Sequence, residues 1–167
     1  MLLVAMADGM HAVVTRPYVG RRHDVYGLHA GSYRGEVGIL DKLQQKMDGT
    51  PYAIYGDVGF PQGEPRLWAP FRGADSRLTP EQLQFNKLFK IGRVSVEWSF
   101  SKLKTNFNAI SVAQGNKTFL MRLEAMYLVA VLLTNCHTCM YGSQVGTYHG
   151  QCPPPTLREY LQLPPRS

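Results

Sequence analysis

Two carboxylates, Asp57 and Glu97, are the residues of this sequence best placed to do chemistry. Asp57 follows a short apolar run and opens a loop rich in glycine and proline, and ligand sites in open α/β sheets lie just past the carboxyl ends of strands. Glu97 is the one acid in a basic stretch whose cationic residues are Lys87, Lys90, Arg93, Lys102, Lys104, Lys117 and Arg122. Carboxylate oxygens suit hard cations, and a basic surface suits a phosphate backbone. The pair therefore outlines a two-metal phosphodiester site, although isolated acids more often cap helices, pair with cations or face solvent.

The elements that must position these residues belong to a chain of 167 residues, the size of one domain. Its apolar fraction of 44% is enough for a core, and its formal charge of +6 is compatible with a polyanionic partner. No stretch approaches the roughly 18 consecutive apolar residues of a membrane span, so we expect no membrane partner. Three cysteines near the C-terminus do not make a disulfide framework, which indicates a reducing compartment.

The first half of the chain predicts short strands around one helix. Asp8-Gly9 lies between two β-favouring runs and predicts a hairpin. Pro70 confines the last strand to an edge or an end of a sheet. The expected elements are hairpin strands over Leu2–Met6 and His11–Tyr18, a helix over Val37–Met47, a buried strand over Tyr52–Tyr55 and a strand over Leu67–Phe71.

The second half predicts helices. Thr79 followed by Pro80 is a typical helix start, with a hydroxyl cap and proline in the first turn. The expected helices cover Thr79–Phe107, Thr118–Asn135 and Thr156–Leu161, with a loop over Tyr141–Gly150. One face of the first helix carries Lys90, Arg93, Glu97, Ser101 and Lys104. The second helix is apolar almost all round and should be buried. Alternation of strands and helices predicts an α/β fold.

Four blocks of the chain, in this order, resemble those of the PIF/Harbinger-type transposases of the DDE superfamily. Gly20-Arg21-Arg22-His23-Asp24 resembles their Gly-x-x-His-Asp block, and Tyr55-Gly56-Asp57-Val58-Gly59-Phe60-Pro61 their Gly-Asp-x-(Gly/Ala)-Tyr-Pro block. Phe85-Asn86 with the run Arg93–Lys104 resembles the block that carries their catalytic glutamate. Ala130–Asn135 is similar to the Leu-x-Asn end of their last helix.

The resemblance implies a ribonuclease-H-like mixed sheet with flanking helices and a catalytic Asp, Asp, Glu set. By motif match, Asp57 is the second aspartate and Glu97 the glutamate. In the family these residues bind two divalent metals, Mg²⁺ or Mn²⁺. One metal activates water or a 3′-hydroxyl, and the other stabilises the leaving oxygen. The resemblance also implies DNA as substrate, a separate DNA-binding accessory protein and a nuclear location.

The chain departs from the family at the first aspartate, which the family carries on a first, central strand. No such strand precedes the predicted hairpin, so residues 1–167 are expected to be one N-terminally truncated endonuclease domain, with a core over about 1–135 and a tail over 136–167. Asp8 is a poor substitute because a hairpin tip points away from a strand-end site. Loss of one metal ligand predicts impaired catalysis.

Other polar residues could support the site. His23 and Asp24 could cap the following segment or sit close to the metal. Arg21 and Arg22, together with Lys90, Arg93 and Lys104, are the candidate DNA contacts. Trp68 and Trp98 could stack on bases, although Trp98 flanks an apolar stripe and is expected to be packed.

Two alternatives to an active nuclease remain. One is a catalytically inactive, transposon-derived DNA-binding remnant. The other is a small zinc-stabilised interaction domain, because Cys136, Cys139, His149 and Cys152 have the formal spacing of a four-ligand zinc site. Against zinc, cysteines at the end of a buried helix behave as small apolar residues.

Overall fold

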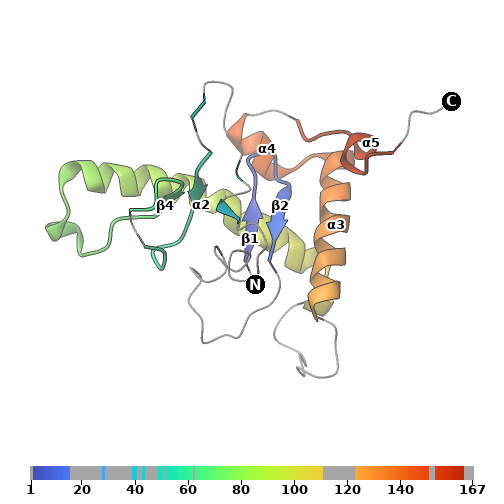
Figure 1. Ribbon diagram of the computed structural model, residues 1–167, viewed down its shortest axis with the longest axis horizontal. Helices are drawn as coiled ribbons and strands as arrows, with labels where there is room; N and C mark the ends of the chain where they lie inside the picture. Colours follow the sequence, from blue (N-terminus) through green and yellow to red (C-terminus); the bar gives the residue numbers. More distant parts are fainter. Residues whose placement is uncertain are drawn as a thin grey trace. The chain divides into compact units, whose positions relative to one another are not determined.

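A computed structural model describes residues 2–15, 28, 39–40, 43, 49–50, 52–61, 63–110, 123–150 and 153–163. The chain divides into two compact units. The first comprises Met1–Val4 and Thr15–Gly92, and the second Ala5–Val14 and Arg93–Ser167. The described strands form two two-stranded sheets, β1-β2 and β3-β4. This mixture of small sheets and helices agrees with the predicted α/β class (Figure 1).

The predicted hairpin is confirmed. Strands β1 (Leu3–Ala5) and β2 (His11–Val14) lie side by side (Figure 1) and are joined by the Asp8-Gly9 turn. The Asp8 carboxylate accepts the Met10 N–H at 2.8 Å, and Gly9 adopts a φ of 86°, which favours glycine. A Cβ on Gly9 would lie 2.1 Å from the Ser143 hydroxyl oxygen, so glycine is required here for space as well. The expected continuation of β2 to Tyr18 falls outside the described residues.

Strands β3 (Ile54–Tyr55) and β4 (Leu67–Trp68) confirm the two other predicted strands, but both are shorter than expected. They pair in parallel, with Ile54 opposite Leu67 and Tyr55 opposite Trp68. The expectation that the first would be buried is wrong, because Tyr55 is 60% exposed. A two-stranded ribbon has one covered face, here marked by buried Leu67, and one open face. The predicted helix over Val37–Met47 lies largely outside the described residues.

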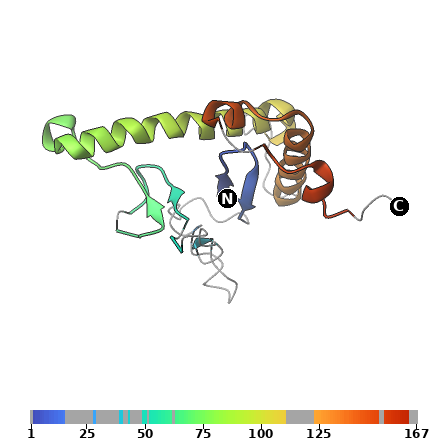
Figure 2. The ribbon, with the colours of Figure 1, turned by 90° about the horizontal axis from the view of Figure 1, so that it is seen from above.

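Helix α2 (Pro80–Asn106) confirms the helix predicted from Thr79 (Figure 2). The Thr79 hydroxyl accepts the Gln82 N–H at 3.3 Å, and the Gln82 side chain accepts the Thr79 N–H at 3.0 Å. This reciprocal capping box satisfies two backbone donors that a helix start leaves open. Five residues of the predicted polar face are all exposed: Lys90, Arg93, Glu97, Ser101 and Lys104.

Helix α3 (Leu123–Tyr141) corrects one prediction and extends another. The helix runs past Asn135, and only one side of it is buried. That side contacts β2, the short helix η4 (Asn108–Ile110) and α5 (Leu157–Tyr160), as Figure 1 shows for α5. The other side is exposed and carries Leu128, Val129, Leu132, Leu133 and Met140. An apolar composition all round did not lead to burial all round, because burial depends on which elements pack against the helix.

The loop expected over Tyr141–Gly150 is also corrected, because it contains helix α4 (Gln144–His149). The Ser143 hydroxyl accepts the Val145 N–H at 3.2 Å and starts the helix, and Gly150 ends it in a left-handed conformation. The predicted terminal helix is confirmed as α5, with a capping box between Thr156 and Glu159. No helix in the described part of the chain is long and apolar enough to span a membrane.

Candidate functional site

Asp57 lies two residues after the end of β3, where the parallel strand pair has ended and a loop begins. Its side chain is exposed, and its Oδ1 accepts the Val58 N–H at 2.7 Å. Its carbonyl oxygen accepts the Phe60 N–H at 3.0 Å, which closes a tight turn. The carboxylate therefore lies at the strand end where an α/β sheet places its ligands, as the sequence predicted.

Arg72 holds the loop that follows Asp57. Its Nε donates to the Val58 carbonyl at 2.8 Å, and its Nη2 donates to the Phe60 carbonyl at 3.3 Å. Phe60 is buried, and a Cβ on Gly56 would lie 2.7 Å from its ring. The loop is thus held from outside by a guanidinium and from inside by a packed ring, and sequence reasoning did not identify Arg72 in this role.

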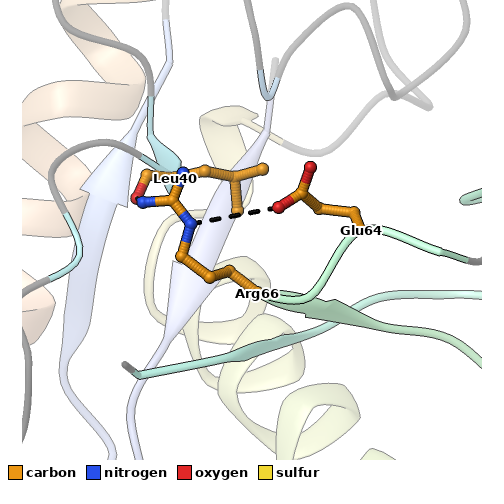
Figure 3. A network of polar contacts seen from close by, with 3 residues as sticks. All are labelled: Leu40, Glu64 and Arg66. Atoms are coloured by element: carbon orange, nitrogen blue, oxygen red, sulfur yellow. Dashed lines mark hydrogen bonds and ion pairs between the residues drawn. The ribbon is translucent and has the colours of Figure 1, made fainter. Parts of the chain in front are cut away.

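Two further side chains hold the segment that contains β4. Arg66 donates from Nη1 to the Leu40 carbonyl at 2.5 Å, and its Nε lies 3.9 Å from the Glu64 carboxylate (Figure 3). The Asn86 side chain on α2 accepts the Phe71 N–H at 2.9 Å and donates to the Phe71 carbonyl at 3.1 Å. Asn86, a residue of the family-like block, therefore anchors the chain after β4 to the start of α2.

Glu97 lies on the part of α2 that belongs to the second unit, and its side chain is exposed. Its Oε1 is 3.2 Å from Arg93 Nε, one turn earlier on the helix. Both side chains are more than half exposed, so solvent screens the pair and the pair contributes little stability. The opposite side of this part of the helix carries the buried Ser95 and Ser99, which direct Glu97 outward.

A buried polar network in the second unit was not predicted from the sequence. The Asn135 side chain accepts the His11 N–H and donates to the His11 carbonyl, both at 2.9 Å, and it also donates to the Tyr160 hydroxyl at 3.0 Å. The Ser99 hydroxyl oxygen lies 3.3 Å from His11 Nδ1. His11 and Ser99 are only 4% and 3% exposed, so this Ser–His pair cannot reach a substrate. Asn135 instead joins the hairpin, α3 and α5.

Burial sets the protonation of this network. Desolvation, with a smaller contribution from the positive charge of Lys102, lowers the pKa of His11 to about 4. Lys102 donates to the Thr138 hydroxyl at 3.0 Å and to the Gly142 carbonyl at 3.5 Å, and burial lowers its pKa as well. Lys102 is half-buried, and its ammonium group is held by these two acceptors within the second unit.

The candidate DNA contacts divide into two sets. Lys90, Arg93 and Lys104 are exposed on α2, as a phosphate-binding role requires. The remaining candidates, Arg21 and Arg22, lie outside the described residues, as do the possible supporting residues His23 and Asp24. Trp98 packs edge-on against Tyr148 with ring centroids 5.2 Å apart, which agrees with the expectation that it is packed.

Among the described residues, no three His, Cys, Asp or Glu side chains gather closely enough to hold a metal ion. The predicted zinc ligands Cys136, Cys139 and His149 therefore do not form a site, and Cys152 lies outside the described residues. Cys139 instead contacts Met10, with its Sγ 3.6 Å from the methionine sulfur, and burial raises its pKa. It packs as an apolar residue, as expected for a cysteine at this position.

The donor chemistry of Asp57 and Glu97 fits a hard divalent cation, because both side chains end in carboxylate oxygens and both are open to solvent. The two belong to different units, and each is held by its own surroundings. Asp8, the weak candidate for a third carboxylate, accepts a backbone N–H within the hairpin turn.

Comparison with known proteins gives one finding. A family model described as DDE superfamily endonuclease matches residues 1–135, which include Asp57, Glu97 and the hairpin. The match ends at Asn135, the residue that joins the hairpin to α3. Neither the curated proteins nor the solved structures contain a match to the chain.

Proposed function

We propose, from the premise that the chain belongs to the DDE superfamily endonucleases, that it is the nuclease domain of a PIF/Harbinger-type transposase that acts on DNA. The observation that carries this proposal is the position of Asp57. It is an exposed carboxylate at the end of a parallel strand pair, in a loop held by Arg72, within the matched region. The PIF/Harbinger assignment rests on the four sequence blocks described above.

Asp57 and Glu97 would hold Mg²⁺ or Mn²⁺ through their carboxylate oxygens. When bound, the metals supply the charge that activates a hydroxyl and stabilises the leaving oxygen of a phosphodiester. The role of the protein is to hold the two carboxylates in place. Arg72 fixes the Asp57 loop through two carbonyls, and the buried side of α2 orients Glu97.

The exposed cations of α2 would bind the DNA backbone. Lys90, Arg93 and Lys104 share the face that carries Glu97, and each neutralised phosphate releases counterions. Binding should therefore weaken steeply with salt. We further propose that the protein works in the nucleus and that a separate accessory protein supplies target recognition.

A metal-dependent plasmid-nicking assay tests the proposal. Asp57→Asn and Glu97→Gln keep the size of each side chain and remove its charge, so each should abolish nicking while the fold persists. Asp75→Asn, in the short helix η3 (Asp75–Arg77), and Glu81→Gln, in the first turn of α2, are control changes of exposed acids and should nick like the unmodified protein. Nicking that survives both site changes would exclude these carboxylates as metal ligands.

A second candidate is a DNA-binding domain without nuclease activity. It is favoured by the basic face of α2, on which Lys90, Arg93 and Lys104 are exposed. Two carboxylates hold two cations poorly, so we expect cleavage to be weak at best. This candidate predicts salt-dependent binding of DNA and no nicking at any Mg²⁺ or Mn²⁺ concentration. Affinity that does not change with salt would exclude it.

A further inference from the structure

A row of five aromatic side chains in the first unit forms a continuous surface that we call the aromatic shelf. Tyr55 lies edge-on to Trp68 with ring centroids 5.6 Å apart, and it also contacts Phe89 at 5.4 Å. Phe85 contacts Phe89, Phe71 and Trp68 at 5.8, 5.4 and 6.5 Å. Each ring therefore contacts at least one neighbour, and the row links β3, β4 and α2.

The outer rings of the shelf are open to solvent. Tyr55 is 60% exposed and Trp68 is 45% exposed. Large aromatic side chains normally bury most of their area, so two adjacent exposed rings indicate a surface for a flat, apolar ligand.

The shelf is preformed, because the backbone beneath it is held at several points. Tyr55 and Trp68 are register partners in the parallel pair, and the Gly56 N–H donates to the Trp68 carbonyl at 2.8 Å. Asn86 holds the Phe71 backbone through two hydrogen bonds. A ligand would therefore meet rings already in position, and little ordering would be needed on binding.

Two hollows in the surface meet at Phe71. One, of about 420 Å³, is mainly apolar and is lined by Trp68, Phe85 and their neighbours. The other, of about 450 Å³, is mainly polar and is lined by Arg72, Arg77 and Gln82. Both are open to solvent over most of their extent, so they can contact one side of a flat ligand without enclosing it. An apolar hollow beside an arginine-lined one matches a base and its phosphate.

The charges around the shelf favour nucleic acid over an apolar protein surface. Two exposed cations, Arg72 and Arg77, line the hollow that meets the shelf at Phe71, against one acid, Glu64, at the apolar hollow. The candidate metal ligand Asp57 follows Tyr55 by two residues. A base on the shelf would therefore lie close along the chain to the carboxylate proposed to hold the metal.

We propose that the aromatic shelf binds an unpaired nucleobase of the DNA strand at the cleavage site by stacking on Trp68, with Tyr55 edge-on beside that ring. This inference rests on the nuclease function proposed above and adds a preference for distorted or single-stranded DNA. Stacking on a ring face is tolerant of sequence, because every base presents a π-face. The shelf thus favours unpaired DNA over duplex DNA and does not distinguish one base from another.

The test compares the two tryptophans of the chain. Trp68→Leu removes an exposed ring of the shelf, and Trp98→Leu is the matched control because Trp98 packs against Tyr148. Binding of a labelled twelve-nucleotide oligothymidylate is measured by fluorescence polarisation at fixed salt, beside a duplex of equal length. Trp68→Leu should weaken single-strand binding roughly tenfold or more and leave duplex binding within about twofold. Trp98→Leu should change neither, and Trp68→Phe, which keeps a ring, should recover most of the loss.

A fluorescence titration gives a second readout. In a Trp98→Phe background the emission reports Trp68 alone, and the oligothymidylate should quench it. The proposal is overturned if Trp68→Leu binds single strands as tightly as Trp98→Leu does, if duplex affinity falls equally, or if Trp68 is not quenched. If metal-dependent nicking continues in any of these cases, the proposed nuclease function is retained and only the role of the aromatic shelf is rejected. Nicking insensitive to Asp57→Asn would instead remove the proposed function.

Discussion

Acid should destabilise the second unit through one residue, His11. This side chain is 4% exposed, and its backbone is held on both sides by the Asn135 amide. Burial and the charge of Lys102 lower its pKa from 6.5 to about 4. The folded protein therefore binds this proton more weakly than the unfolded chain does.

The sign and size of the effect follow from proton linkage. A histidine whose pKa is lower in the folded protein than in the unfolded chain costs no stability well above pH 6.5, because the imidazole is then neutral in both states. Below that pH the unfolded state gains a proton first, so the free energy of unfolding falls until pH reaches about 4. Each tenfold difference in proton affinity is worth about 1.4 kcal/mol, so the full loss is about 3 kcal/mol. About 2 kcal/mol of this is lost between pH 7.5 and pH 5.

Urea unfolding followed by circular dichroism at pH 7.5, 6.5, 5.5 and 5 measures this loss. The range stops at pH 5 because Glu159, whose pKa a hydrogen bond from Thr156 lowers below 4.5, titrates beyond it. His11→Gln should be less stable at pH 7.5 but should have a flat profile. His137→Gln, which changes an exposed histidine on α3, should keep the profile of the unmodified protein. The assignment of this pH dependence to His11 would be refuted if the free energy of unfolding of the unmodified protein did not change with pH. It would also be refuted if that free energy changed with the same slope in His11→Gln.

Three further predictions concern packing and can be checked by the same urea unfolding at pH 7.5. Val131→Ala should cost about 2 kcal/mol and Leu132→Ala less than about 0.5 kcal/mol, because the first side chain is buried and its neighbour is 44% exposed. Equal losses would contradict the one-sided burial of α3. Asn86→Ala should cost about 1–3 kcal/mol, since it leaves two backbone groups without their partner; an unchanged midpoint would count against that anchor. Gly9→Ala should destabilise by more than about 1 kcal/mol, and Ser143→Gly in the same chain should restore part of the loss by relieving the 2.1 Å approach. A double variant no better than the single one would contradict the steric account.

The sequence by itself determined the features that depend on neighbouring residues. The Asp8-Gly9 turn was predictable because a left-handed turn position favours glycine. The start of α2 was predictable because Thr79 and Pro80 satisfy the local needs of a helix end. The exposed positions of Asp57 and Glu97 were also predictable, since one follows a strand signal and the other lies on a polar helix face.

Only the tertiary structure decided which surfaces are covered and which distant groups meet. The sequence predicted a buried α3 and a buried β3, yet Leu132 and Tyr55 are exposed. Apolar composition states what a segment can bury, and the elements packed against it decide what is buried. The hydrogen bonds of Asn135 to the His11 backbone join residues 124 positions apart, and no local pattern signals such a contact. For the same reason the sequence suggested stacking on Trp68 alone and not the aromatic shelf: the rings come from two strands, the segment after β4 and a helix, and only folding brings them together.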